Sequence, residues 1–413
     1  NNTYNKRQGL LAEHIVRGKI ISSDGKTLAH TVVNEDGSEK RVYPYGDMFA
    51  HSVGRFSKGR TGVELSENYR LLTSNNNGLK KIFMELTGQK NIGDNVITTL
   101  NYDLQRVAYE SLGNNKGAIV VMEPSSGKIL AMVSKPAYDP NKIDSIWEEI
   151  KDDNVKKQLT NRVSQEAYPP GSIFKVVTLL EYIRENPDYN NYTYECNGKY
   201  VGAFGEITCG KAHGKVNLKE SLAYSCNTSF ANIGENLNSD KWKESVASLQ
   251  LDTYIPTNID YNHPFTAIGQ GDVMVSPMQM ATLTSAIANG GIAMKPYFVD
   301  HIENSDGNTI KKFLPEMKNT LISSTEAEIL TEYMEEVVQI GTASGMKNNK
   351  YTVAAKTGTA QNKIGSKSHS WFIGFANTNS PEIAVAVIVE NVGSGSKYAV
   401  PIANNIFKTY FNQ

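Results

Sequence analysis

Short runs that alternate between apolar and polar residues occupy the first part of the chain, and turn-forming residues separate them. Residues 18–21 and 31–33 have the character of hairpin strands, and a Ser-Ser-Asp-Gly turn at 22–25 lies between them. This polar, turn-rich texture continues for roughly the first hundred residues. We therefore predict a small β-rich domain over residues 1–97.

A different pattern begins at residue 98. An amphipathic stretch at 104–112 predicts a helix. Two apolar runs at 117–124 and 128–134, joined by Ser-Ser-Gly, predict a β-hairpin. Residues 138–166 are charged and mostly helical in character. This order of elements marks the start of a second domain.

The long middle section has helical periodicity, which is clearest at 218–237 and 278–289. Three strand-like runs follow near the end of the chain, at 352–355, 370–376 and 383–390. Residues 398–411 predict a closing helix. Strands on both sides of a helical insert fit an α+β domain, with an antiparallel sheet, over residues 98–413.

The composition excludes two classes of protein. With 39% apolar and 21% charged residues among 413, the chain is typical of a globular protein and unlike a disordered one. Its 42 basic residues nearly balance its 43 acidic residues, so we expect no nucleic-acid partner. No run reaches the roughly 18 consecutive apolar residues of a membrane-spanning helix. Because the sequence starts Asn-Asn-Thr without a Met, we expect a targeting or anchoring segment before it.

Ser172 and Lys175 form a candidate nucleophile and base. A Pro-Pro-Gly break at 169–171 sets a helix start, and a spacing of three places the hydroxyl and the amine on one face of that helix. Free N–H groups in the first turn favour a developing oxyanion. Lys175 serves as a base only if burial or a second cation lowers its pKa. The Ser-x-x-Lys pattern alone is a weak signal, since solvated helices often carry it.

Two further motifs supply a second cation and a second hydroxyl. The Lys-Thr-Gly-Thr motif at 356–359 offers a charge that can hold a carboxylate, and its glycine lets another backbone approach closely. In the Ser-Cys-Asn motif at 225–227, the hydroxyl can shuttle a proton and the amide can orient the substrate and Lys175. Each motif taken singly is more often structural than catalytic.

The three motifs occur in one order, separated by about 50 and 130 residues, and in this the chain resembles the penicillin-interacting serine acyltransferases. Further segments are similar to class B penicillin-binding proteins: 17–20, 62–64, 117–121, 128–132, 168–172, 269–271, 276–280 and 356–361. The resemblance covers essentially the whole chain. It implies the penicillin-binding transpeptidase fold, in which helices flank an antiparallel five-stranded sheet beside a helical subdomain, and a small N-terminal pedestal domain precedes them.

The resemblance also implies an activity, that of a serine D,D-transpeptidase that cross-links peptidoglycan stem peptides and is inhibited by β-lactam antibiotics. The implied catalytic residues are Ser172, Lys175, Ser225, Asn227 and Lys356, and the implied substrate-binding residues are Thr357, Gly358 and Thr359. Backbone N–H groups at the positions of Ser172 and Thr359 form the family's oxyanion hole, and catalysis needs no cofactor. The alternatives are a D,D-carboxypeptidase or β-lactamase that uses the same acyl-enzyme, and a non-catalytic penicillin sensor or scaffold.

For location and partners, the resemblance implies the extracytoplasmic face of the cell membrane and an N-terminal transmembrane anchor. A membrane-embedded glycosyltransferase of the shape, elongation, division and sporulation family is the protein partner that it suggests. The growth phase served and the acceptor amine stay open.

The three cysteines and one histidine form a candidate metal site. Cys196, Cys209, His213 and Cys226 follow the spacing C-x12-C-x3-H-x12-C. Three thiolates and one imidazole suffice for tetrahedral structural zinc. The alternatives are a Cys196–Cys209 disulfide beside a buried Cys226 thiol, or three unlinked core cysteines. If zinc is bound, Cys226 ties it directly to the Ser-Cys-Asn motif.

Overall fold

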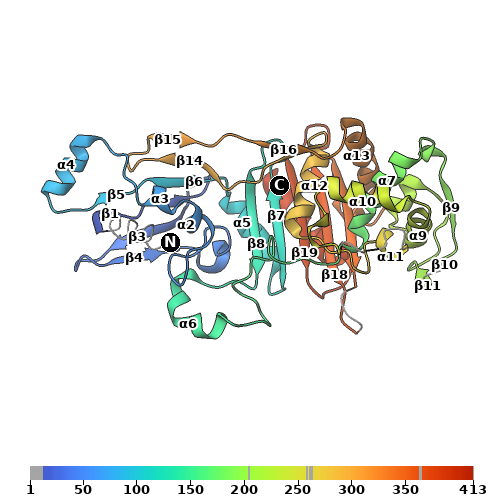
Figure 1. Ribbon diagram of the computed structural model, residues 1–413, viewed down its shortest axis with the longest axis horizontal. Helices are drawn as coiled ribbons and strands as arrows, with labels where there is room; N and C mark the ends of the chain where they lie inside the picture. Colours follow the sequence, from blue (N-terminus) through green and yellow to red (C-terminus); the bar gives the residue numbers. More distant parts are fainter. Residues whose placement is uncertain (1–12, 203–204, 257–258, 260–263, 362–364, 413) are drawn as a thin grey trace. The chain divides into compact units, whose positions relative to one another are not determined.

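The computed structural model describes residues 13–202, 205–256, 259, 264–361 and 365–412 (Figure 1). The chain forms two compact units, and each takes in three stretches of sequence. Unit 1 comprises Asn1–Tyr109, Lys128–Asn161 and Tyr297–Pro315; unit 2 comprises Glu110–Gly127, Arg162–Pro296 and Glu316–Gln413. The division into domains at residues 97 and 98 stays a prediction.

Unit 1 contains a six-stranded sheet with the order β15-β14-β6-β2-β3-β4. Its strands are β2 (Ile20–Ile21), β3 (Thr27–Val33), β4 (Glu39–Val42), β6 (Asn95–Thr98), β14 (Val299–Glu303) and β15 (Thr309–Lys312). The β2–β6 pair is parallel, and the other pairs are antiparallel. Strands β14 and β15 come from a much later part of the chain than the other four strands. This sheet therefore forms by pairing of segments that are distant in sequence.

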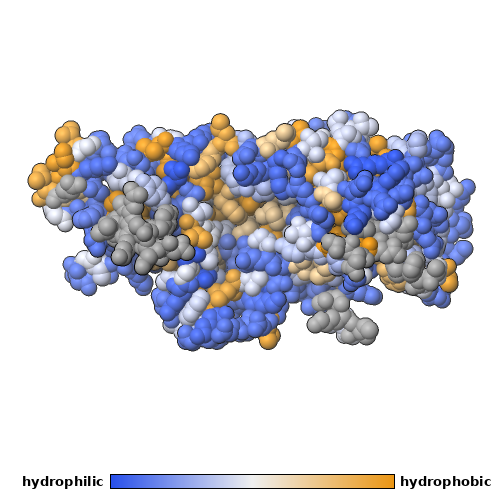
Figure 2. All heavy atoms as spheres, viewed as in Figure 1, coloured by the Kyte–Doolittle hydropathy of each residue, from blue (hydrophilic) through white to orange (hydrophobic). Residues whose placement is uncertain are grey.

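Short helices and one more strand pair also belong to unit 1. They are β1 (Ile15–Val16) paired with β5 (Asn91–Ile92), η1 (Gly46–Phe49), η2 (Pro140–Lys142), α2 (Gly62–Ser66), α3 (Asn68–Leu71), α4 (Gly78–Leu86) and α6 (Ile143–Ile150). Leu79, Ile82, Phe83 and Leu86 are 54–82% exposed and lie on one face of α4, where Figure 2 shows an orange patch. Helix α4 therefore presents an apolar stripe at the surface of unit 1.

A buried ion network surrounds the carboxylate of Glu64, a residue of α2. The Glu64 carboxylate accepts hydrogen bonds from Arg17 Nε and Arg41 Nε, both at 2.7 Å, and from Tyr43 Oη at 3.2 Å. Arg17 also donates to Asn68 Oδ1 at 2.6 Å. Burial alone would raise the pKa of Glu64, but the guanidinium groups of Arg41 and Arg17 lower it overall. The carboxylate is thus held in its charged form by two cations.

The second sheet has five strands in the order β17-β18-β19-β7-β8. The strands are β7 (Gly117–Met122), β8 (Ile129–Lys135), β17 (Val353–Ala360), β18 (His369–Ala376) and β19 (Ile383–Val389). Strand pairs β17–β18, β18–β19 and β19–β7 are antiparallel. Every residue of β7, β18 and β19 is buried, which accounts for their nearly continuous apolar sequence. The predicted α+β class and the antiparallel five-stranded sheet are confirmed.

Three long helices of unit 2 contact this sheet, namely α12 (Pro277–Ala288), α13 (Ser324–Gln339) and α14 (Gly395–Tyr410). Helices α12 and α13 each begin with a capping box, in which a serine and the residue three positions later bond each other's backbone N–H groups. The other helices are α5 (Tyr102–Leu112), η3 (Gly171–Phe174), α7 (Lys175–Glu185), η4 (Tyr189–Asn191), α8 (Leu218–Ala223), α9 (Asn227–Glu235), α10 (Ser239–Ser248), η5 (Asp252–Tyr254), α11 (Pro264–Ala267) and η6 (Ser344–Met346).

Three small two-stranded sheets belong to unit 2. They pair β9 (Thr193–Cys196) with β12 (Gly214–Asn217), β10 (Lys199–Gly202) with β11 (Gly205–Thr208), and β13 (Ile292–Met294) with β16 (Met317–Thr320). The first two of these sheets are formed by the segment of chain between α7 and α8. Among the described residues, no helix is long and apolar enough to cross a bilayer.

Two predicted helices differ from the structure. The helix predicted at 218–237 is wrong as a single element, because the chain turns at 224–226 and separates α8 from α9. In the stretch 138–166, helical structure is confined to η2 and α6 at 140–150, and the remainder is turns and irregular backbone. Apolar periodicity continues across the turn at 224–226, so the sequence pattern alone does not show that one helix ends and another begins there.

Candidate active site

Ser172 follows Gly171, which allows two backbone segments to approach each other closely. Gly171 has φ +54°, and its N–H donates to Gly269 O at 2.8 Å. A Cβ at position 171 would lie 2.6 Å from Thr359 O on β17. Only glycine combines that conformation with that approach. The Pro-Pro-Gly break therefore fixes Ser172 against the strand that carries the Lys-Thr-Gly-Thr motif.

Lys175 follows one turn later and is the first residue of α7. Residues three apart in a 3₁₀ turn such as η3 lie above one another, so Lys175 shares a face with Ser172. Its side chain is fully buried, and its Nζ contacts Ser225 O at 2.7 Å, Asn227 Oδ1 at 2.7 Å and Ser225 Oγ at 3.2 Å. Burial lowers the pKa of Lys175 to about 7.

These contacts suit a neutral amine. A neutral lysine has two N–H bonds and one lone pair, and the two carbonyl oxygens at 2.7 Å accept both N–H bonds. The lone pair is then left for a hydroxyl proton. In the described part of the chain, Ser172 Oγ makes no hydrogen bond, and Ser172 lines a cavity. Lys175 is thus oriented by Ser225 and Asn227 before any proton transfer.

Ser225 has a strained backbone. Its φ is +56°, in the left-handed region where glycine is usual. Ser225 N donates to Leu222 O at 3.1 Å and Cys226 N donates to Ser221 O at 2.9 Å, which is the hydrogen-bond pattern of a Schellman helix end. This turn ends α8, and α9 starts two residues later with Asn227. Such strain is common at functional sites, where surrounding structure holds it.

Lys356 reaches the same hydroxyl from the sheet. It lies on β17, is fully buried, and its Nζ donates to Ser225 Oγ at 2.9 Å and Thr357 O at 2.9 Å. Burial, and then the charge of Lys175, hold the pKa of Lys356 well below its usual range. Ser225 Oγ therefore lies between two amines, on three segments that are far apart in sequence.

The rest of the Lys-Thr-Gly-Thr motif has separate positions on β17. A Cβ at Gly358 would lie 3.0 Å from Ile173 Cγ2 on η3, so this glycine lets η3 pack on the strand. Thr359 lines the cavity, and its Oγ1 accepts a hydrogen bond from Gly395 N at 3.3 Å. Thr357 Oγ1 instead pairs with Thr342 Oγ1 at 2.6 Å.

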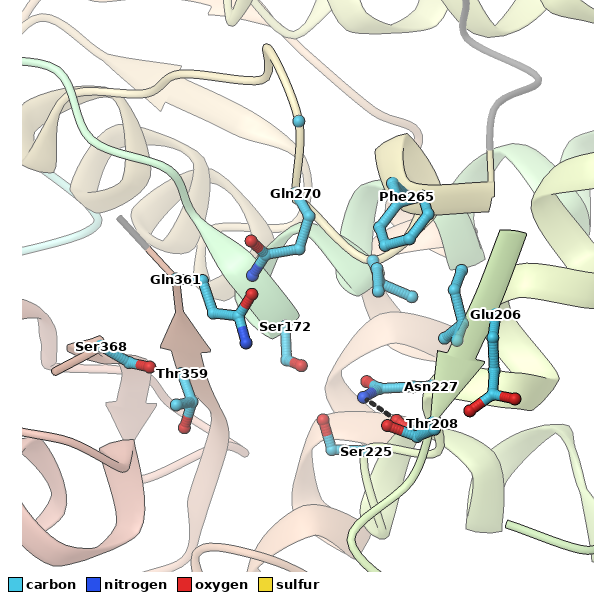
Figure 3. Close-up of a pocket in the computed structure, with 13 residues that line it drawn as sticks. Ser172, Glu206, Thr208, Ser225, Asn227, Phe265, Gln270, Thr359, Gln361 and Ser368 are labelled. Atoms are coloured by element: carbon cyan, nitrogen blue, oxygen red, sulfur yellow. Dashed lines mark hydrogen bonds between the residues drawn. The ribbon is translucent and has the colours of Figure 1, made fainter. Parts of the chain in front are cut away.

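These segments enclose a cavity of about 650 Å³ (Figure 3). It is lined by Ser172, Glu206, Ile207, Thr208, Ser225, Asn227, Phe265, Ile268, Gln270, Gly271, Thr359, Gln361 and Ser368. In Figure 3, Ser172 and Ser225 lie between Thr359 on one side and Asn227 on the other. Asn227 Nδ2 also donates to Thr208 O at 2.9 Å, which holds β11 at the cavity edge.

Sequence reasoning did not find several cavity residues. Glu206 and Thr208 come from β11, which no motif marks. Phe265 and Ile268 come from the region of α11. The contact between β11 and Asn227 holds the first pair at the cavity, and a non-local contact of that kind leaves no pattern in the chain.

The four predicted metal ligands come together next to this site. The ligand atoms of Cys196, Cys209, His213 and Cys226 all lie within 4.8 Å of one another. Sγ of Cys209 is 3.8 Å from Sγ of both Cys196 and Cys226, and Cys196 Sγ is 3.4 Å from His213 Nδ1. No disulfide joins the three cysteines. The thiol of Cys226 and the sulfur of Cys209 share a hydrogen bond, which lowers the pKa of Cys209 and raises that of Cys226.

This donor set fits a tetrahedral zinc ion. Zinc–sulfur bonds near 2.3 Å place the sulfurs of a tetrahedral site roughly 3.8 Å apart, which is the separation of Cys209 Sγ from the sulfurs of both Cys196 and Cys226. Cys226 caps the N-terminus of α9 and lies between Ser225 and Asn227. The candidate metal site and the candidate active site therefore share one turn of the backbone.

The comparison with known families covers both units. Residues 117–408 match the penicillin-binding protein transpeptidase domain. The chain belongs to the penicillin-binding protein transpeptidase family. Residues 17–96 match the penicillin-binding protein A dimerisation domain. The resemblance to class B penicillin-binding proteins is confirmed.

Relatives of this penicillin-binding protein match over most of their length. It is 33% identical to the peptidoglycan D,D-transpeptidase PbpA of Mycolicibacterium smegmatis, over 95% of this chain and 89% of that relative. It is similar to penicillin-binding protein A of M. tuberculosis in a ceftriaxone acyl-enzyme complex, with a TM-score of 0.86, 29% identity, and coverage of 96% and 99%. The D,D-transpeptidase domain of a peptidoglycan glycosyltransferase from Eggerthella lenta gives a TM-score of 0.83 at 28% identity, covering 97% and 99%.

Proposed function

We propose that this penicillin-binding protein is a serine D,D-transpeptidase that cross-links peptidoglycan stem peptides through an acyl-enzyme on Ser172, and that β-lactams inhibit it by acylating the same oxygen. One observation carries the proposal: Ser172 and Ser225 line one cavity, and Ser225 Oγ contacts the two buried amines of Lys175 and Lys356. The relatives named as D,D-transpeptidases and the acyl-enzyme structures support it.

Acylation starts with proton transfer from Ser172. The Oγ of Ser172 attacks the penultimate D-Ala carbonyl, and its proton passes to the lone pair of Lys175. The amide bond then breaks, and the departing D-Ala nitrogen takes up a proton from Lys175 directly or through Ser225 Oγ. Since Lys356 donates to Ser225 Oγ, the hydrogen of Ser225 is free to point toward the leaving group.

The substrate's carboxylate and the oxyanion have separate partners in this proposal. Thr359 on the cavity wall and the N–H groups of Lys356 favour the terminal carboxylate, together with the Thr357 and Gly358 backbone. The N–H groups of Ser172 and Thr359 bind the developing oxyanion, and one such donor typically contributes about 3 kcal/mol to the transition state.

Intact-mass spectrometry with a fluorescent penicillin tests the proposal. Wild type should gain the mass of one penicillin, while Ser172→Ala and Lys175→Ala should gain none within the same time. A thermal unfolding curve for each variant checks that it folds. Rapid loss of the wild-type adduct would favour a β-lactamase, and absence of an adduct would contradict the proposal altogether.

We also propose that Cys196, Cys209, His213 and Cys226 hold a structural zinc ion, which takes no part in the chemical steps. The donor types, the sulfur separations and the free state of the cysteines support it. By fixing Cys226, the ion would stabilise the turn that carries Ser225 and the start of α9.

Elemental analysis and one variant test the zinc proposal. Purified protein should contain one zinc per chain, and Cys226→Ser should lose it and acylate more slowly. Ser229→Ala is the control. It removes a buried hydroxyl on α9 that is not a predicted ligand, so this variant should keep its zinc. Full acylation by Cys226→Ser, with no zinc in wild type, would remove the proposal.

Location and the protein partner stay proposals of the same kind. Stem peptides are cross-linked outside the cytoplasmic membrane, so we place the activity on the extracytoplasmic face, with an N-terminal transmembrane anchor. A membrane-embedded glycosyltransferase would bind the dimerisation-domain region at 17–96 and supply the glycan strands. Co-purification of the full-length protein with such an enzyme from membranes, lost when residues 17–96 are removed, is the expected result.

A further inference from the structure

The wall of the active-site cavity contains a single ionisable side chain among the described residues, and it is acidic. Glu206 lies on β11, at the Asn227 side of the cavity, whereas Thr359 and Ser368 line the opposite side (Figure 3). The two buried lysines contact Ser225 Oγ and do not line the wall. The cavity is thus electrically asymmetric about Ser172.

The position of Glu206 is set by β11. Val201 on β10 faces Glu206 in the antiparallel register, and the carbonyl of Thr208 accepts a hydrogen bond from Asn227 Nδ2 at 2.9 Å. Glu206 and Thr208 share the exposed face of β11, the intervening Ile207 is buried, and all three residues line the cavity. The residue that orients Lys175 therefore also positions the strand that carries the carboxylate.

The carboxylate is available to a ligand. Its ion pair in the structure is with Lys199 Nζ at 3.2 Å, and the two side chains are 47% and 66% exposed. Exposed pairs of this kind contribute little, because water solvates both groups. A substrate cation can replace Lys199 at low cost.

We propose that Glu206 forms a subsite for an alkylammonium group, namely the acceptor amine of cross-linking; this deepens the proposed function and rests on it. An alkyl amine carries its proton at neutral pH, since its pKa is near 10. The leaving carboxylate belongs on the Lys356 side of Ser172. The cationic acceptor belongs on the opposite side, where Glu206 attracts it and raises its local concentration.

The chemical step balances without a further reactant. The bound ammonium loses one proton to solvent, and its nitrogen forms a bond to the acyl carbon. The bond from that carbon to Ser172 Oγ breaks, and the second amine proton passes through Lys175 to Ser172 Oγ. Glu206 holds the incoming cation and does not enter the covalent chemistry.

A thioester of N-acyl-D-alanine, which has no amine, serves as the donor in the test. The acceptors are an N-acetylated lysine peptide with a free side-chain amine and hydroxylamine, which is uncharged at neutral pH. For the lysine peptide, Glu206→Gln should raise the acceptor KM about two- to fivefold, the range for an exposed ion pair. For hydroxylamine it should leave KM unchanged, and acylation by a fluorescent penicillin should match wild type.

Two variants and one condition sharpen the test. Lys199→Gln frees the carboxylate and should lower the KM for the lysine peptide. Glu195→Gln, on neighbouring β9 and outside the cavity lining, is the matched control and should match wild type. The effect of Glu206→Gln should shrink between roughly 0.02 M and 0.5 M salt, because added ions screen exposed charges.

An unchanged KM in Glu206→Gln, or an equal rise with hydroxylamine, would overturn the subsite. So would a donor effect, in which Glu206→Gln slows acylation by a stem peptide with a free side-chain amine but not by its acetylated form. Failure of the proposed function is distinct from all of these, since wild type would then form no penicillin adduct.

Discussion

At the scale of single residues, burial is what makes Lys175 usable as a base. In water a lysine keeps its proton to about pH 10, and burial lowers the pKa of Lys175 to about 7. The neutral form, which can take the proton of Ser172, therefore becomes the major form as the pH rises through about 7. Below that pH the amine is protonated and cannot act.

This gives the first prediction, for the pH dependence of acylation. The rate of penicillin acylation should rise close to tenfold between about pH 6 and pH 8 and then level off, because the neutral fraction of Lys175 rises by that factor. Lys175→Arg stays protonated throughout and should lose at least about 10²-fold at every pH. Lys408→Arg, on the exposed end of α14, should keep the wild-type profile. A flat profile from pH 6 to 8 would contradict this role.

The second prediction uses two substitutions of Ser225, which distinguish the effect of its backbone strain on stability from the role of its hydroxyl in acylation. Ser225→Ala and Ser225→Gly both remove the hydroxyl between Lys175 and Lys356, so both should acylate far more slowly than wild type. Glycine accepts φ +56° without strain, whereas alanine does not. Ser225→Gly should therefore exceed Ser225→Ala in free energy of unfolding by about 1 kcal/mol in urea titrations. Equal stability of the two variants would show that the turn is unstrained.

The sequence made some of these residues predictable and not others. Ser172, Lys175 and Lys356 sit in short motifs whose chemistry can be argued from residue type, and the structure brings them to one place. The left-handed backbone of Ser225 left no such signal, because serine rarely adopts it. Glu206 left none either, since only the fold of β10 and β11 makes it part of the cavity.

At the scale of elements, the site depends on how closely η3 approaches β17. Gly171 and Gly358 remove side chains from both surfaces of that contact. The third prediction concerns Gly171→Ala, which adds a Cβ about 2.6 Å from Thr359 O at φ +54°. We expect it to slow penicillin acylation at least about tenfold and to lower the free energy of unfolding by more than about 1 kcal/mol.

Gly290→Ala is the matched control for that prediction. Gly290 has φ +62°, but a Cβ there meets nothing within 4 Å. It should show the cost of the backbone conformation alone, about 1 kcal/mol, with unchanged acylation. Equal effects of the two variants would mean that the contact between η3 and β17 does not matter.

Elements with strong apolar patterns were predictable, and elements set by long-range contacts were not. The buried strands β18 and β19 and the amphipathic helix α5 follow from local pattern, since each has a continuous or periodic apolar sequence. The break between α8 and α9 was missed because apolar residues continue on both sides of it. Strands β14 and β15 join the sheet of unit 1 from residues 299–312, and no local signal indicates their partners.

At the scale of the whole molecule, the active-site cavity and the buried ion network of Glu64 lie in different units. Every residue of the active-site cavity belongs to unit 2. The ion network of Glu64 with Arg17 and Arg41 belongs to unit 1. A substitution in that network should therefore affect folding of unit 1 without altering the groups that react with penicillin.

The fourth prediction is that Glu64→Gln destabilises unit 1 by about 3–5 kcal/mol, because it leaves two buried guanidinium groups without their carboxylate. Since the folded pKa of Glu64 is below its ordinary value of 4.5, the stabilisation is present above that value and is lost as pH falls through the folded pKa. Hydrogen exchange measured by mass spectrometry should show faster exchange in peptides from residues 13–109 of the variant at neutral pH. Glu39→Gln, which breaks only the exposed pair with Lys90, should change little. Penicillin acylation by Glu64→Gln should match wild type; a parallel loss would show instead that the chemistry of unit 2 depends on an intact unit 1.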